Sequence, residues 1–173
     1  MNFRISPYLI AGIAVVGFII RAMYWYPILP DTVAIHFGFD GIANNWSNKL
    51  DFMFIIGGVM LFLTLVFFGL ILLIRKIPDS MINLPNKEYW LSPERRNSTL
   101  DAMVLFLNEI GSRTLLLLAV VFELTCRTNA SSIQQLDSQT FLIVLGMYLF
   151  GVVVPIVYFV KKFTKPEAPN LNA

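Results

Sequence analysis

The chain has 173 residues, of which 57% are hydrophobic and 14% are charged, with a formal net charge of +2. Soluble domains carry about 25% charged residues, so this composition indicates a protein that is solvated largely by lipid. The small, dispersed positive charge excludes direct nucleic-acid binding. One cysteine and one histidine cannot form an internal disulfide or a tetrahedral metal site, so no metal or cofactor is expected.

Four apolar segments are long enough to cross a bilayer, which requires about 20 predominantly apolar residues. They cover residues 7–25, 52–74, 93–126 and 140–160. The first segment follows a basic start, as in a signal peptide, but no small-residue cleavage site follows it, so we predict an uncleaved helix. The predicted fold class is an all-α integral membrane protein, with one four-helix membrane domain over residues 1–165 and a disordered tail over residues 166–173.

Lysine and arginine are distributed unevenly among the connecting segments. Residues 75–100 and the C-terminal segment hold most of them: Arg75, Lys76, Lys87, Arg95, Arg96, Lys161, Lys162 and Lys165. The loops at 26–51 and 126–139 hold only Lys49 and Arg127. Because basic residues favour the cytoplasmic side, both termini and the second loop are predicted in the cytoplasm, and the first and third loops outside.

The third apolar segment differs from the others because it is longer and carries charges. A helix over residues 93–126 is about 50 Å long, against a hydrocarbon core of about 30 Å, so its first turns should project into the cytoplasm. Glu109 and Arg113 are i,i+4 partners on this helix, and we place them near the inner edge of the bilayer. They form either an ion pair that locks the bundle or part of a substrate or ion pathway, because intramembrane ionisable residues are functional candidates.

The loop after the first helix has the pattern of a short β-hairpin. In TVAIHFGF, Val33, Ile35, Phe37 and Phe39 alternate with smaller or polar residues, and the pair Asp40-Gly41 follows. Period-two alternation before Asp-Gly is typical of a hairpin. We predict that this hairpin lies on the outer membrane surface with its apolar face towards the membrane.

The same loop, YPILPDTVAIHFGFDGIANNWSNK, resembles a known signature at ten positions. They are Tyr26, Pro27, Leu29, Pro30, Asp31, His36, Phe37, Gly41, Trp46 and Lys49. The stretch is similar to the SdpI-like family of bacterial membrane proteins, known for an immunity protein against the sporulation-delaying toxin; its N-terminal module is a domain of unknown function. The chain departs from the pattern at Asn44 and at Val33-Ala34, and it has four predicted spans where that immunity protein has more. The resemblance implies a protein of the bacterial cytoplasmic membrane.

His36 has three interpretations from its surroundings. It could fix the hairpin through a hydrogen bond, it could contact an extracellular ligand, or it could join nearby carboxylates in a metal or catalytic site. A lone histidine with irregularly spaced carboxylates is a weak metal signal, so the structural interpretation leads.

The segment NLPNKEYWLSPERR, from Asn83 to Arg96, is similar to one found in a subgroup of proteins with this module. Ser92 and Pro93 are typical of a helix start, as N-cap and first helical residue. Tyr89 and Trp90 are expected to anchor at the inner interface. The alternative is a docking surface for a cytoplasmic protein or an anionic lipid headgroup, formed by Lys87, Trp90, Arg95 and Arg96.

These features favour a non-enzymatic membrane sensor or immunity-type protein that recognises an extracellular peptide or envelope component. A small transporter or transporter subunit is the alternative, and a membrane-embedded enzyme comes third, because no metalloprotease, nucleophile-elbow or phosphate-loop motif is present. The expected partners are membrane lipid, an extracellular peptide and a cytoplasmic regulatory protein. The expected ligand-binding residues of the outer loop are Tyr26, Pro30, Asp31, His36, Phe37, Gly41, Trp46 and Lys49.

Overall fold

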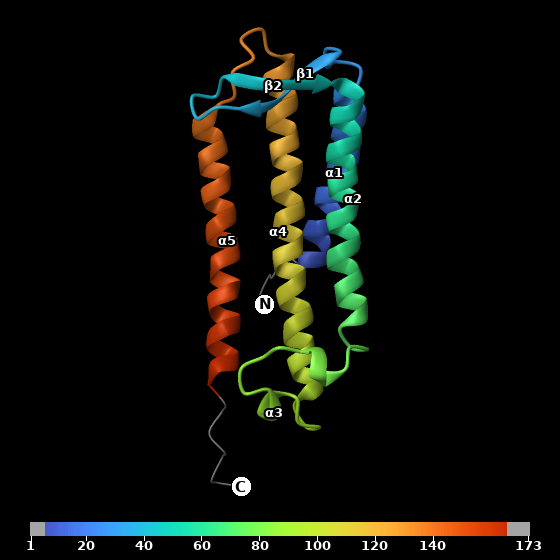
Figure 1. Cartoon of the computed structure of the whole chain (residues 1–173), viewed down its shortest axis with the longest axis vertical. Helices are drawn as coiled ribbons and strands as arrows, with labels where there is room; N and C mark the ends of the chain where they lie inside the picture. The colour runs from blue at the N-terminus through green and yellow to red at the C-terminus, as the bar shows by residue number, and fades with distance from the viewer. Residues whose placement is uncertain (1–5, 166–173) are drawn as a thin grey trace.

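In the computed structural model, which describes residues 6–165, four long helices lie side by side and a two-stranded hairpin covers one end of the bundle (Figure 1). Each long helix is long and apolar enough to cross a membrane, which confirms the predicted four-span helical class. They are α1 (Pro7–Trp25), α2 (Lys49–Leu73), α4 (Arg96–Ala130) and α5 (Ser138–Thr164). The predicted disordered tail, residues 166–173, lies outside the described residues.

The shorter elements lie at the two ends of the bundle. The hairpin pairs β1 (Thr32–Phe37) with β2 (Ala43–Asn48) in antiparallel orientation. It and the loop of residues 131–137 form what we call the hairpin end. A 3-10 turn, η1 (Asp79–Met81), and the short α3 (Lys87–Trp90) occupy the opposite end, which we call the α3 end (Figure 1).

Three of the four span starts differ from the sequence-based bounds. The fourth span begins at Ser138 instead of residue 140, with Asp137 as its N-cap. The second span begins at Lys49 instead of residue 52, because the Asn48 side chain accepts the amide of Asp51 at 2.7 Å and caps the helix. The third span begins at Arg96 instead of Pro93 and ends at Ala130. Ser92 is not its N-cap: the Ser92 carbonyl accepts the amides of Arg95 and Arg96, so the residues after Ser92 form a separate turn before the helix.

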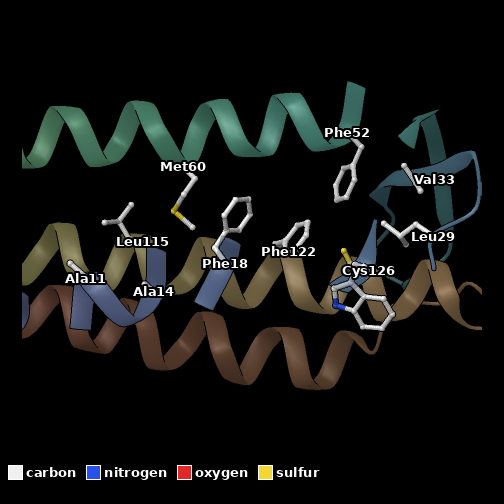
Figure 2. Close-up of a cluster of buried hydrophobic side chains, with 11 residues drawn as sticks. Ala11, Ala14, Phe18, Leu29, Val33, Phe52, Met60, Leu115, Phe122 and Cys126 are labelled. Carbon is white, nitrogen blue, oxygen red and sulfur yellow. The ribbon is translucent and has the colours of Figure 1, made fainter. Parts of the chain in front are cut away.

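The central helix of the bundle is α4, which packs against α1, α2, α5 and β1. Its Phe122 ring contacts Phe18 of α1 at 4.8 Å and Phe52 of α2 at 5.9 Å between ring centroids (Figure 2). Leu115 and Cys126 extend this core along α4. The helix α5 packs chiefly on α4, and the other faces of its apolar span are exposed to the surroundings. Such a surface is suited to lipid.

The alternating face predicted for the hairpin is only partly formed. Ala34 pairs with Trp46 and His36 pairs with Asn45, so Ile35 is an extra residue that shifts the register. A bulge of this kind turns successive side chains away from strict alternation. Val33 and Ala34 are both fully buried, whereas Ile35 is exposed, so Val33 and Ile35 do not share one face of the hairpin as the alternation predicted.

Candidate functional site

The hairpin is attached to α4 through one buried side chain. The Ala34 amide donates to Asn129 Oδ1 at 2.6 Å, and Asn129 Nδ2 donates to the Ala34 carbonyl at 2.9 Å. The same Nδ2 donates to the Thr125 carbonyl at 3.0 Å, which fixes the amide on its own helix. A primary amide has the donor and acceptor geometry of a peptide group, so Asn129 pairs with β1 as a further strand would.

A second attachment joins the hairpin turn to the loop before α5. Gly41 has φ = 78°, a left-handed conformation that glycine adopts readily. Its carbonyl accepts the amide of Leu136 at 2.9 Å, and a Cβ at this position would lie 2.3 Å from the Leu136 carbonyl oxygen. Gln135 adds a side-chain bond to the Asp40 carbonyl at 2.9 Å. Gly41 is therefore required for both the turn and the close approach.

The loop before α5 then leads directly into the helix cap. Asp137 accepts the amide of Thr140 at 3.0 Å and its hydroxyl at 2.5 Å. Hydrogen bonds from the Thr140 hydroxyl, and then from its amide, lower the pKa of Asp137. The hairpin end is thus continuous with the first turn of α5.

The predicted outer-loop residues divide into supporting and exposed groups. Lys49 is half-buried; its Nζ donates to the Leu29 carbonyl at 3.1 Å and lies 3.3 Å from Asp31. Gly41 supports the turn, and Phe37 is half-buried. The exposed group is Tyr26, Pro30, Asp31, His36 and Trp46.

His36 belongs to the exposed group and contacts a neighbour in the hairpin. Its Nδ1 lies 2.5 Å from the Asn44 side-chain oxygen. Over residues 6–165, no three His, Cys, Asp or Glu side chains are grouped so that they could hold a metal ion. A shallow hollow of about 370 Å³ lies beside this pair, lined by Gly38, Phe39, Asp40, Ile42 and Asn44. The exposed imidazole and the hollow together offer a small polar and aromatic contact surface.

Below the hairpin lies an ion cluster whose members come from α1 and α4, far apart in the sequence. Glu123 of α4 accepts Arg21 Nε at 2.8 Å, Arg21 Nη2 at 3.0 Å, Trp25 Nε1 at 2.8 Å and Arg127 Nε at 2.7 Å. The Arg21 guanidinium also lies over the Tyr24 ring, 4.2 Å from its centroid. In the sequence, Arg21 and Glu123 are isolated charges near the ends of two apolar segments. Their pairing depends on which helices pack together, which the sequence does not show.

At the α3 end, Trp90 faces the interior instead of the surface proposed for docking. Its Nε1 donates to the Phe163 carbonyl at 2.9 Å, and the two rings meet edge to face at 5.1 Å. The Thr99 hydroxyl donates to the Trp90 carbonyl at 2.8 Å. Trp90 therefore holds the end of α5 against the start of α4, which removes it from any accessible binding surface.

The basic residues of the α3 end remain accessible to different degrees. Arg96 donates to Asp79 at 2.9 Å, and the Arg95 guanidinium lies over the Tyr89 ring at 4.2 Å. Lys87 is half-buried. The pKa of the Glu94 carboxyl is lowered, first by the Glu94 backbone amide and then by the Ser92 hydroxyl.

Glu109 and Arg113 form an i,i+4 ion pair, with Arg113 Nη1 at 3.5 Å from Glu109 Oε2 and at 2.8 Å from the Glu109 carbonyl. They lie deeper than predicted. A Cβ on Gly151, the middle residue of α5, would be 3.3 Å from Arg113 Cδ, so the pair lies opposite the centre of a span and not near the inner edge. The helix packing, which the sequence does not show, decides this depth.

The pair faces a crevice of about 900 Å³ with α4 as its floor and α1 and α5 as its sides. Polar groups from several turns line it, among them Asp101, Ser112 and Lys162. Pro155 also lines it, and because proline has no N–H, the carbonyl of Gly151 lacks its usual helical donor. The crevice is therefore lined by apolar side chains together with charged and polar groups from α4 and α5.

The comparisons with known proteins place one module in the chain. The profile of a domain of unknown function, DUF1648, matches residues 12–61. No curated protein and no solved structure matches the chain. The matched segment contains most of α1, the whole hairpin and the first half of α2, whereas Asn129, Gln135 and the crevice floor lie outside it. The chain is therefore a multi-pass membrane protein that carries this module.

Proposed function

We propose that the protein is a non-enzymatic membrane sensor or immunity-type protein of the SdpI-like kind, which recognises an extracellular peptide or envelope component at its hairpin end. The distribution of lysine and arginine supports an orientation with both termini in the cytoplasm of a bacterial cell and the hairpin outside. The ten loop positions that resemble the family signature support the choice of the hairpin as the recognition surface.

The attachment of the hairpin to Asn129 is the observation that carries this proposal. Ala34 is wholly buried and Asn129 is 3% exposed, so a ligand that displaces β1 must disturb buried hydrogen bonds on α4. From Ala130 back to Arg96, α4 is one continuous helix of 35 residues. At 1.5 Å per residue this helix is about 50 Å long, which suffices to connect the two membrane surfaces.

The α3 end provides the matching output surface in this proposal. Trp90 fixes the end of α5 to the start of α4, so a shift of α4 would change the contacts that Trp90 makes with Thr99 and Phe163. Arg95 and Lys87 lie beside this junction and offer positive charge to an acidic cytoplasmic protein. Charge of this kind contributes orientation and association rate more than affinity.

The experiment uses a strain that lacks the chain and is complemented with wild type, His36→Ala or Asn97→Ala. Cells are exposed to the peptide fraction of the organism's own culture medium, and survival, the transcriptional response and membrane expression are measured. We expect His36→Ala to reduce survival and response at normal expression, because His36 is exposed. Asn97→Ala also changes an exposed residue, at the α3 end, and should behave as wild type.

Three results would contradict the proposal. Equal responses from the deletion and wild-type strains would remove the sensor function. Loss of His36→Ala from the membrane would assign a structural role to the histidine. Zinc in the purified protein that disappears with His36→Ala would show a metal site instead.

A small transporter or transporter subunit is the second candidate, favoured by the crevice beside Glu109 and Arg113. Their side chains are 23% and 34% exposed opposite the centre of α5, where contact with hydrocarbon is costly. The nearby Asn108 Nδ2 is buried and has no hydrogen-bond partner among the described residues. In liposomes with an internal pH dye, a proton transporter should show flux that Glu109→Gln abolishes. If the pair is only structural, a variant with both residues changed to glutamine should have the same free energy of unfolding as wild type.

A further inference from the structure

Two arginines share one carboxylate in the cluster around Glu123. Glu123 Oε1 accepts both Arg21 Nη2 at 3.0 Å and Arg127 Nε at 2.7 Å. Because both bonds end on the same oxygen, the two guanidinium groups are held side by side. Two positive charges against one negative charge leave the cluster with a net charge of +1.

The carboxylate is already well supplied with donors. Each Glu123 oxygen accepts two hydrogen bonds, and Trp25 provides one of them. Arg21 Nη1 and both terminal nitrogens of Arg127 have no acceptor among the described residues, and the Arg127 side chain is 67% exposed. Their remaining N–H groups therefore favour a further anionic acceptor.

The depth of the cluster indicates which anion is available. Phe122, the residue before Glu123, stacks on Phe52, which follows Asp51 in the first turn of α2. Glu123 therefore lies level with the polar start of a membrane span, where the headgroups of the surrounding leaflet begin. The Tyr24 ring beneath Arg21 is half exposed, as aromatic residues are at this boundary.

We propose that Arg21 and Arg127 bind the phosphodiester of an anionic phospholipid in the leaflet at the hairpin end. Arginine donates to phosphate oxygens through two parallel N–H groups, and the shared carboxylate orients both guanidinium groups before the lipid arrives. The exposed apolar side chains of Val16 and Ile20 come before Arg21 on α1, towards the centre of the span, and offer a surface for the acyl chains. A free phosphate would use the charge but not this apolar surface, so the lipid is the preferred source.

The experiment titrates phosphatidylglycerol into the full-length protein in dodecyl maltoside micelles and counts bound lipids by native mass spectrometry. The main variant, Arg127→Gln, removes one guanidinium and leaves Arg21 and Trp25 on Glu123. We expect its tightest lipid site to weaken about tenfold, the effect of losing charge-assisted bonds. Arg75→Gln is the matched control, because Arg75 forms an exposed ion pair with Asp101 at the opposite end and carries the same charge. It should bind as wild type.

Several results would overturn the assignment. They are an unchanged lipid affinity in Arg127→Gln, equal weakening in Arg75→Gln, and phosphatidylcholine bound as tightly as phosphatidylglycerol. Inorganic phosphate that displaces the lipid at millimolar concentration would show a free-anion site instead. Circular dichroism checks that Arg127→Gln is folded. If it is not, Arg127→Lys provides the comparison: weaker binding than wild type supports the site, and equal binding contradicts it.

Discussion

Replacement of Asn129 by alanine tests whether α4 holds the hairpin. In the native chain, the Asn129 amide satisfies both the N–H and the C=O of Ala34, and all three groups are buried. Alanine removes the partner without changing the helix or the strand. The two backbone groups of Ala34 are then left buried and unpaired.

The expected loss follows from the cost of unpaired buried polar groups. Each such group costs about 1–3 kcal/mol. A water molecule entering the space left by the amide would offset part of this cost. We therefore expect Asn129→Ala to lower the free energy of unfolding by about 2–4 kcal/mol.

Unfolding in dodecyl maltoside with added denaturant, followed by tryptophan fluorescence, provides the measurement. Trp25 is buried near this site and Trp46 lies opposite Ala34 in the hairpin, so both rings report the local change. Asn97→Ala, an exposed change on the same helix, should stay within about 0.5 kcal/mol of wild type. An equally small change for Asn129→Ala would refute the reasoning and show that β2 alone holds β1.

Three further predictions concern the hairpin end. Gly41→Ala should separate the turn from the loop before α5, because its Cβ would lie 2.3 Å from the Leu136 carbonyl oxygen; faster amide exchange at Leu136 is the measurement, and unchanged exchange would contradict it. With Cys126 replaced by alanine, Asn45→Cys should react with an impermeant maleimide added outside intact cells, and protection there would reverse the proposed orientation. The hydrogen bonds that lower the pKa of Asp137 stabilise the fold above the unfolded pKa and are lost as the pH falls through the lower folded pKa. The stability difference between wild type and Asp137→Asn should therefore shrink below about pH 4, and a constant difference would exclude this cap.

The spacing of charged residues along a helix predicted which residues pair inside the bundle, but not how deep the pair lies. Glu109 and Arg113 were predicted as partners because i,i+4 residues are neighbours on any helix, and they do pair. Their depth was misjudged because it depends on which residues of α4 and α5 become neighbours, and Arg113 lies beside Gly151 in the middle of α5. Trp90 was predicted at the membrane interface, but it is buried for a related reason. Its indole N–H donates to the carbonyl of Phe163, which lies 73 residues further along the chain.

The sequence by itself determined the four spans, the Asp40-Gly41 turn and the uneven distribution of basic residues, because each depends on the composition of a local segment. Only the tertiary structure decided that Arg21 meets Glu123 and that Asn129 meets Ala34, contacts that join residues 102 and 95 positions apart. A polar side chain on an apolar helix predicts that a partner exists, because an unpaired polar group in lipid is costly. Which partner it finds depends on the order and depth in which the helices pack, and no local pattern of residues specifies that arrangement.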